Sequence, residues 1–257
     1  MERPYLMKSI FKIHPLFYLV ALLTVLTGNF KDFILVFLIV MIHELGHITV
    51  ALYYRWNISR VVILPFGGMT IFEEYLNRPW KEEFLIAIAG PIYQIIFYQL
   101  LCIFHLNTEL FQFYHYALLF FNLLPMIPLD GSKILNLLFQ KRIPYQKSNS
   151  LMGWISIVVI NFLFFFLYYY RNFIMFIFLF FLFIQIIKQM KKQRYLFHKF
   201  ILERYTNSFS FFKIKMIKGV QIHLMMRECN HYFLENNHYF SEKEILHRRF
   251  HLTSFKA

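Results

Sequence analysis

Six long apolar stretches dominate this sequence. They cover about residues 14–30, 33–54, 84–104, 110–138, 151–170 and 172–188. A helix needs roughly 20 mainly apolar residues to cross the hydrocarbon core of a bilayer. The sequence therefore predicts an α-helical polytopic membrane protein with about six transmembrane helices. Pro125 and Pro128 should break the fourth helix.

The composition supports a membrane protein and argues against several other classes. Apolar residues make up 58% of the chain and charged residues 16%, whereas soluble domains have about 45–50% and about 25%. This excess of apolar residues excludes a disordered chain and an ordinary cytosolic enzyme. Two cysteines, Cys102 and Cys229, provide no disulfide framework.

Positive charge is concentrated in four segments that six spans would place on one side of the membrane. These are the N-terminus, the loop before residue 84, the loop after residue 138 and the tail from Lys188. The other three loops hold only Lys31 and Arg171. Because cytoplasmic loops are enriched in Lys and Arg, we expect both termini in the cytoplasm.

The last part of the chain is the most basic. Residues 1–187 carry 13 Lys and Arg against 9 Asp and Glu, whereas residues 188–257 carry 14 against 5. Such a tail is typical of a segment that contacts anionic lipid headgroups. Nucleic-acid binding is the alternative, but no nucleic-acid-binding motif accompanies the charge. We expect a membrane domain over 1–195 and a cytoplasmic basic linker and module over 196–257.

The second apolar stretch contains the motif HELGH. His43 and His47 are four residues apart, so they lie on one face of a helix, where two imidazoles can bind one zinc ion. Glu44 is placed to reach a zinc-bound water, as in HExxH metalloproteases. A chance match is expected only about 0.02 times in a chain of this composition, and ionisable groups inside a span are costly unless they function. Gly46 could in addition allow close helix packing.

A catalytic zinc ion needs a third protein ligand. The candidates are His14, Glu73, Glu74, His105, Glu109, His115 and Asp130. A rise of 1.5 Å per residue places His43 and His47 nearer the cytoplasm, and Asp130, about 20 residues into its stretch, at a similar depth. Prolines and a glycine surround Asp130, and broken helices at membrane depth occur against protein or water-filled cavities. Alternatively, Asp130 only caps its span at the interface.

Together, HELGH and the later segment NLLPMIPLDG resemble the site-2 protease family of intramembrane zinc metalloproteases, and most nearly its sporulation branch. Five further stretches add to the resemblance, which covers most of residues 8–205: KIHPLF, LPFGG, NRPWKEEF, AGP and ILERY. The resemblance implies one zinc ion bound by His43, His47 and Asp130, with Glu44 as general base. It implies that Asn122 and Pro128 help to place the substrate backbone. Ser132 departs from the pattern, which has a second glycine there.

The resemblance also places LPFGG, with Gly67 and Gly68, in a short membrane-associated hairpin loop beside the site. An ordinary turn is the alternative for this segment, and a packing kink is the alternative for Gly90 and Pro91.

The tail from Lys213 predicts a small α+β module. KIKMI alternates like a strand, residues 220–229 predict a short helix, and Asn236-Asn237 predicts a hairpin turn. Ser241 and Glu244 form a capping-box pattern before a last helix. This β-α-β-β-α order resembles a CBS (cystathionine-β-synthase) module, which implies homo-oligomerisation and ATP binding. Otherwise the histidines of the tail form a solvated basic surface rather than a second metal site.

Three functions are compatible with these observations. The first is an intramembrane protease that releases a membrane-associated pro-protein, and the sporulation resemblance implies the sigma-factor precursor pro-σK. It also implies inhibitory membrane partners and a place in the mother-cell membrane around the forespore. The second is a membrane zinc peptidase with another substrate, and the third is a non-catalytic scaffold. All four site residues are present, which argues against the scaffold. No direct binding of nucleic acid is expected.

Overall fold

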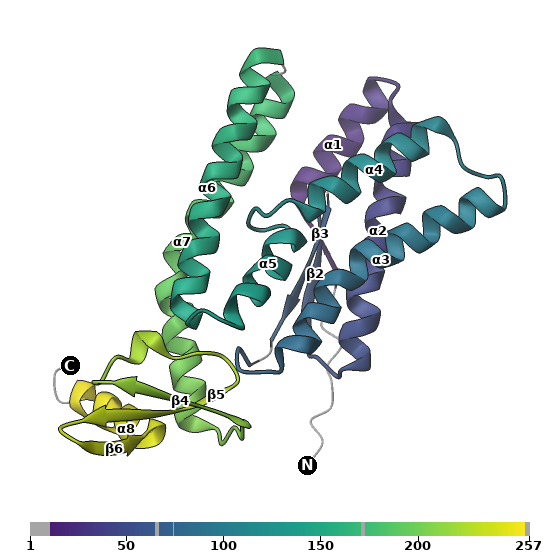
Figure 1. The fold of residues 1–257 in the computed structure, drawn as a ribbon. Coiled ribbons are helices and arrows are strands. Elements are labelled where there is room, and N and C mark those ends of the chain that lie inside the picture. The colour runs from purple at the N-terminus through teal and green to yellow at the C-terminus, as the bar shows by residue number, and fades with distance from the viewer. Residues whose placement is uncertain (1–10, 65–66, 74, 171–172, 255–257) are drawn as a thin grey trace. The chain divides into compact units, whose positions relative to one another are not determined.

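The computed structural model describes residues 11–64, 67–73, 75–170 and 173–254 (Figure 1). The chain divides into two compact units. The first contains the described residues of 11–73 together with 84–123, and the second contains 75–83 together with 124–254. Each unit is described on its own.

The helices of the first unit include two that can cross a membrane. They are α1 (Pro15–Leu26), α2 (Phe30–Tyr53), α3 (Trp80–Ile103), whose first turn belongs to the second unit, and α4 (Glu109–Leu123). With 24 residues each, α2 and α3 are about 36 Å long, which exceeds the roughly 30 Å of a hydrocarbon core. The 12 residues of α1 give only about 18 Å, so the first apolar stretch forms a shorter helix than predicted.

A three-stranded sheet accompanies these helices. β2 (Ile58–Leu64) lies between β1 (Phe11–Ile13), to which it is parallel, and β3 (Gly67–Phe72), to which it is antiparallel. The β2–β3 hairpin contains LPFGG, although Pro65 and Phe66 lie outside the described residues. β3 packs against α2 (Figure 1). Trp56 anchors the sheet, because it packs edge-on against Phe72 and is buried with Ala51 and Ile86.

The second unit begins with three helices. They are α5 (Asp130–Gln140), α6 (Tyr145–Tyr170) and α7 (Phe173–Thr206). α6 and α7 lie side by side as an antiparallel pair (Figure 1). Arg171 and Asn172, which separate the fifth and sixth apolar stretches of the sequence, lie outside the described residues. The 34 residues of α7 span about 51 Å, so its last turns extend well beyond a bilayer core.

The predicted membrane character is confirmed, and the break in the fourth stretch is too. Among the described residues, three helices, α2, α3 and α6, are long and apolar enough to cross a membrane. The fourth stretch forms two helices, because α4 ends at Leu123 and α5 begins at Asp130, after the two prolines. The count of six spans stays a prediction.

The tail folds as a small sheet against a helix. Its elements are β4 (Lys213–Lys218), the 3₁₀ turn η1 (Ile222–Leu224), β5 (Cys229–Glu235), β6 (His238–Ser241) and α8 (Glu242–Ser254). β5 lies between a parallel β4 and an antiparallel β6. Asn236 and Asn237 have φ values of 50° and 63°, as the predicted asparagine turn requires. The capping box is also confirmed, since Ser241 and Glu244 bond reciprocally through backbone N–H and side chain.

The helix predicted over residues 220–229 was wrong in extent, because only the three residues of η1 are helical. Two backbone groups that such a helix would pair internally bond elsewhere. The carbonyl of Met225 accepts from the N–H of Tyr145, and the N–H of Met226 donates to Nε2 of His231. Tertiary hydrogen bonds thus replace the helical ones.

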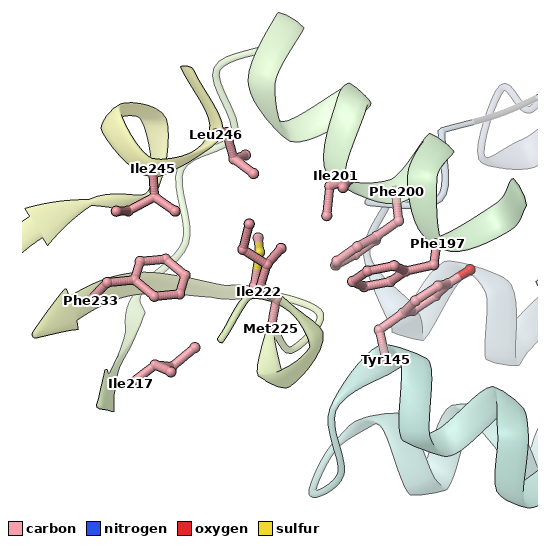
Figure 2. Close-up of a cluster of buried hydrophobic side chains, with 10 residues drawn as sticks. All are labelled: Tyr145, Phe197, Phe200, Ile201, Ile217, Ile222, Met225, Phe233, Ile245 and Leu246. Atoms are coloured by element: carbon pink, nitrogen blue, oxygen red, sulfur yellow. The ribbon is translucent and has the colours of Figure 1, made fainter. Parts of the chain in front are cut away.

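The core of the second unit joins the tail to α6 and α7 (Figure 2). Phe200 stacks on Tyr145, with ring centroids 4.3 Å apart. The rest of the core comes from α7 and from every element of the tail except β6: Phe197, Ile201, Ile217, Ile222, Met225, Phe233, Ile245 and Leu246. The tail therefore shares one hydrophobic core with the ends of the two long helices.

Candidate metal centre

Three ionisable side chains are buried on one face of α2. His43, Glu44 and His47 are 3%, 7% and 5% exposed. They lie within the part of α2 that is long and apolar enough to span a membrane. Buried ionisable groups require partners, and the first unit provides a defined partner for each of them.

The hydrogen bonds of His43 determine which of its nitrogens is protonated. The Gln94 amide nitrogen on α3 donates to the backbone carbonyl of His115 on α4 at 2.9 Å. Its amide oxygen therefore faces Nδ1 of His43, at 3.1 Å. Because an amide oxygen only accepts, Nδ1 of His43 carries the proton and Nε2 keeps a lone pair.

His47 is held in the same tautomer by a different acceptor. Its Nδ1 lies 2.7 Å from the backbone carbonyl oxygen of Ile86 on α3. That oxygen can only accept, so Nδ1 is the donor and Nε2 is again the acceptor nitrogen of the ring.

The two Nε2 atoms face each other at 3.1 Å. With the proton of each neutral ring on Nδ1, both Nε2 atoms are nitrogens of the kind that binds metal ions. Two nitrogens on a tetrahedral zinc ion, each at about 2.0–2.1 Å, are about 3.3 Å apart. The pair thus fits two ligands of one zinc ion, each oriented by an acceptor on its second nitrogen, as metal-binding histidines usually are.

Two glycines make room for this arrangement. A Cβ atom on Gly90 of α3 would overlap the Nε2 atoms of both histidines. A Cβ atom on Gly46 would overlap the carbonyl oxygen of Ala89, so Gly46 allows the close approach of α2 and α3 that was predicted for it. Gly90 therefore does more than form the packing kink that the sequence analysis considered, because its lack of a side chain leaves room for the two Nε2 atoms.

Glu44 lies between α2 and the sheet. One carboxylate oxygen accepts a hydrogen bond from the Thr70 hydroxyl on β3 at 2.8 Å. The backbone of Gly68 lies so close to Glu44 that any side chain at Gly68 would overlap the carboxylate. The structure therefore brings Gly68 and Glu44 together, and the hairpin is more than an ordinary turn at the surface.

Asp130 belongs to the second unit. It is the first residue of α5, is 5% exposed, and forms an ion pair with Lys133 at 3.0 Å. Pro128 is exposed in the segment before α5, and Ser132 is buried in its first turn. Asn122, in the first unit, is half-buried in the last turn of α4.

The other ligand candidates have different surroundings. His115 contributes its backbone carbonyl, while its ring stacks on Tyr98 with centroids 4.3 Å apart. Glu73, His105 and Glu109 are exposed, and His14 is half-buried at the start of α1. Glu74 lies outside the described residues.

Sequence reasoning missed Gln94 and Thr70, and it missed that Gly90 leaves room for the two histidines. A signal existed for Gln94, because it is a polar residue in the middle of an apolar span. Thr70 and Gly90 carry no such signal, because their importance depends on which helix and strand meet α2.

Comparisons with known proteins agree with this geometry. The sequence model of peptidase family M50 matches residues 32–112, which include HELGH and Gln94. Among solved structures, the site-2 protease from Methanocaldococcus jannaschii matches with a TM-score of 0.56 and 26% identity, over 70% of this chain and 89% of that one. The predicted resemblance to the site-2 proteases, which are intramembrane zinc metalloproteases, is thus confirmed.

Particular relatives refine the resemblance. Stage IV sporulation protein FB of Bacillus subtilis is 48% identical over 147 residues, which make up 54% of this chain and 51% of that protein. A zinc metalloprotease of M. jannaschii is 34% identical over 144 residues, or 51% and 42% of the two chains. The chain thus spans about half the length of the curated relatives it matches.

Proposed function

We propose that this chain is an intramembrane zinc metalloendopeptidase of the site-2 protease type. The observation that carries the proposal is the approach of Nε2 of His43 to Nε2 of His47 at 3.1 Å, while both Nδ1 atoms are bonded to acceptors. This arrangement suits two ligands of one cation. Zinc suits it, because zinc prefers imidazole and carboxylate ligands in a tetrahedral geometry.

Asp130 is the proposed third ligand. Two histidines and one carboxylate form a donor set typical of catalytic zinc, which leaves one position open. Asp130 is buried, and a buried carboxylate needs positive charge nearby. It forms an ion pair with Lys133, whose side chain is 50% exposed, and a bound cation would add positive charge to the buried carboxylate.

Glu44 is the proposed general base. When bound, a zinc ion polarises the scissile carbonyl and lowers the pKa of water. Glu44 takes a proton from the attacking water and later passes it to the leaving amine. The hydrogen bond from Thr70 to one carboxylate oxygen fixes the side chain and leaves the other oxygen to accept that proton.

The substrate is proposed to bind as an extended segment. Helical hydrogen bonds shield a peptide bond, so the substrate must unwind locally. β3 is at the edge of its sheet, and among the described strands only β2 pairs with it. An edge strand can add a peptide strand through its free backbone groups. Gly67 and Gly68, at the start of β3, would place that peptide beside Glu44, and Asn122 and Pro128 would help to hold its backbone.

The proposed substrate is a membrane-associated pro-protein cleaved near the cytoplasmic face, and more finely a sporulation sigma-factor precursor such as pro-σK. The similarity to a stage IV sporulation protein supports this choice. The proposal includes cytoplasmic termini, the mother-cell membrane around the forespore and small inhibitory membrane partners. The CBS-like nature of the tail, its pairing into oligomers and its ATP binding stay predictions.

The test replaces the general base and leaves the zinc ligands in place. We expect Glu44→Gln to retain about one zinc ion per chain and to lose cleavage of a co-expressed pro-protein. The loss should be large, because general base catalysis contributes about 10²–10⁴-fold. Zinc is measured by elemental analysis and cleavage by the size of the pro-protein. His43→Ala is the matched variant that should lose zinc as well.

Two results would contradict the proposal. Cleavage that persists in Glu44→Gln would remove Glu44 from the mechanism. Purified wild-type chain without zinc, and with no activity on any pro-protein, would favour a scaffold.

A further inference from the structure

A basic pocket lies in the second unit and shares no residue with the candidate metal centre. Its volume is about 320 Å³, within the usual size of small-ligand pockets. Its polar lining consists of Gln146, Arg194, His198, His223 and Arg249. None of the described residues that line it is acidic, so its field attracts anions.

Four separate parts of the chain build this pocket. Gln146 is in the first turn of α6, Arg194 and His198 are on α7, His223 is in η1, and Arg249 is on α8. A run of basic residues along one helix would produce a charged face without a cavity. Here the charges converge only because the tail folds back onto the two long helices.

The floor of the pocket is part of the hydrophobic core. Phe197 and Ile222 line it, and both are 6% exposed (Figure 2). Neighbouring residues of the core fix these two side chains, so the apolar floor of the pocket is preformed.

The chemistry of the lining selects a phosphate ester. A guanidinium group presents several donors in a fixed fork that matches phosphate oxygens. Two such groups, two imidazoles and an amide can surround a tetrahedral anion from several directions. A planar carboxylate offers two oxygens and would leave part of this donor set without a partner.

The position of the pocket along α7 suggests where the phosphate comes from. Arg194 is six residues beyond Lys188, the first charge after the apolar part of α7, or about 9 Å along the axis. The polar headgroup layer extends about 5–8 Å beyond the hydrocarbon core, so the backbone of Arg194 lies just outside this layer and its long side chain can reach back to a headgroup phosphate. Gln146 lies at the same end of α6, and the Gln193 amide, which donates to the carbonyl of Asn149 at 2.9 Å, keeps the two helix ends aligned.

We propose that this pocket binds a phosphate-ester anion, with a lipid headgroup as the source that its depth favours. The proposal does not rest on the protease activity. A bound headgroup would attach the tail to the bilayer at a defined place, whereas general attraction of basic residues to the surface would not.

The experiment uses the full chain in lipid nanodiscs and has two arms. In the first arm, the nanodiscs contain phosphatidylcholine with some phosphatidylglycerol, and native mass spectrometry counts the phosphatidylglycerol that each chain retains. In the second arm, the nanodiscs contain phosphatidylcholine alone, and equilibrium dialysis measures binding of ATP. Both arms compare the wild type with Arg194→Gln and with Arg194→Gln/Arg249→Gln.

The matched control is Lys191→Gln/Lys192→Gln, which removes the same charge from exposed positions of α7 outside the pocket. We expect the double arginine variant to bind the probe at least about tenfold more weakly than the wild type. The control variant should bind less than about twofold more weakly, because charge-assisted hydrogen bonds are lost only in the double arginine variant. Circular dichroism checks folding, and Arg194→Gln alone, at an exposed position, provides a second variant that should fold.

The two arms also assign the source. Binding of phosphatidylglycerol that depends on Arg194 and Arg249 supports a lipid site, and the same dependence for ATP supports a soluble phosphate ester. The proposal is overturned if neither probe binds the wild type, or if the control variant loses as much binding as the arginine variants.

Discussion

Gln94 should act on the proposed metal centre through His43. It accepts from Nδ1 of His43 and donates to the carbonyl of His115, so it determines the tautomer without touching the metal position. We predict that Gln94→Leu lowers zinc affinity by about 10–100-fold, as is typical when such a hydrogen bond to a metal-binding histidine is lost. Competition with a zinc chelator measures the affinity.

Two variants separate this role from packing. Gln94→Glu keeps an acceptor for His43 and should retain more zinc than Gln94→Leu. Gln99→Leu makes the same change at an exposed position of α3 and should leave zinc affinity unchanged. Equal losses in Gln94→Leu and Gln94→Glu would show that packing, and not the hydrogen bond, matters.

Gly90 gives a second prediction for a single residue. Alanine is preferred to glycine inside a helix by about 1 kcal/mol, so Gly90→Ala should stabilise α3 if space allows. Its Cβ atom would instead overlap both Nε2 atoms. We therefore expect the purified variant to contain less than half of the wild-type zinc, by elemental analysis. Gly153→Ala on α6, where the nearest atoms are ends of flexible side chains, is the control that should keep full zinc.

At this scale the sequence predicts local geometry and misses tertiary geometry. His43, Glu44 and His47 could be found because one helix turn brings them together. Gln94 is 51 residues from His43, and Thr70 is 26 residues from Glu44. Nothing in the periodicity of α2 reveals which residues of α3 and β3 it meets.

Among the elements of the tail, β5 and α8 are joined by a buried ionic network. Glu242, at the start of α8, pairs with Arg204 at 3.1 Å and with Nδ1 of His231 at 3.0 Å. Burial by itself would raise the pKa of Glu242. The hydrogen bond from His231 and the charge of Arg204 outweigh burial, so the pKa lies below its ordinary value.

This lowered pKa makes the network sensitive to acid. A carboxyl whose pKa is lower in the folded state stabilises that state fully above its unfolded pKa of about 4.3 and loses this effect as the pH falls through the folded value. At pH 7, Glu242→Gln leaves Arg204, 3% exposed, without its charge partner, which costs about 3 kcal/mol. We predict faster hydrogen exchange of β5 and α8 in the variant at pH 7, and a difference from wild type that shrinks below about pH 4.

The matched control for this prediction is Glu235→Gln. Glu235 pairs with Arg248 at 3.5 Å, with both side chains at least 40% exposed, so its loss should change exchange little. A Glu242→Gln effect that is independent of pH would contradict an electrostatic origin.

The elements of the tail also show where sequence patterns suffice. The Asn236-Asn237 turn and the capping box of Ser241 and Glu244 were predicted correctly, because both depend on residues within a few positions of each other. The helix over 220–229 was not, because Tyr145 and His231, from other elements, bond to backbone groups that the helix would pair internally. The same holds for β1, whose three residues are a strand only through pairing with β2.

At the scale of the whole molecule, the tail of the second unit holds the segment that leads into α3. Glu203 accepts from the N–H of Leu76 and from the side chain of Asn77. Arg227 donates to the carbonyl of Arg78, and Glu228 accepts from the N–H of Trp80, where α3 begins. Ile86 and Gly90, which contact the two histidines, are six and ten residues further along the same helix.

Removal of the tail should therefore affect catalysis more than metal binding. The chain 1–195 keeps His43, His47 and Asp130 but loses Phe197, Phe200 and Ile201 from the core. It also loses the hydrogen bonds from the tail that fix residues 75–83. We predict about one zinc ion per truncated chain, and kcat/KM for the pro-protein substrate at least about tenfold below the full chain, because small misplacements of reacting groups are costly.

A full-length variant tests whether the contacts between the tail and residues 75–83 cause this loss in kcat/KM. Arg227→Met removes the contacts to Arg78 and Glu83 and should reproduce part of the loss in kcat/KM while the zinc content stays at the wild-type level. Lys218→Met removes the same charge at an exposed position of β4 and should cleave normally. If the truncated chain cleaves as fast as the full chain, residues 75–83 need no support from the tail, and the basic charge of the tail serves only to bind the membrane.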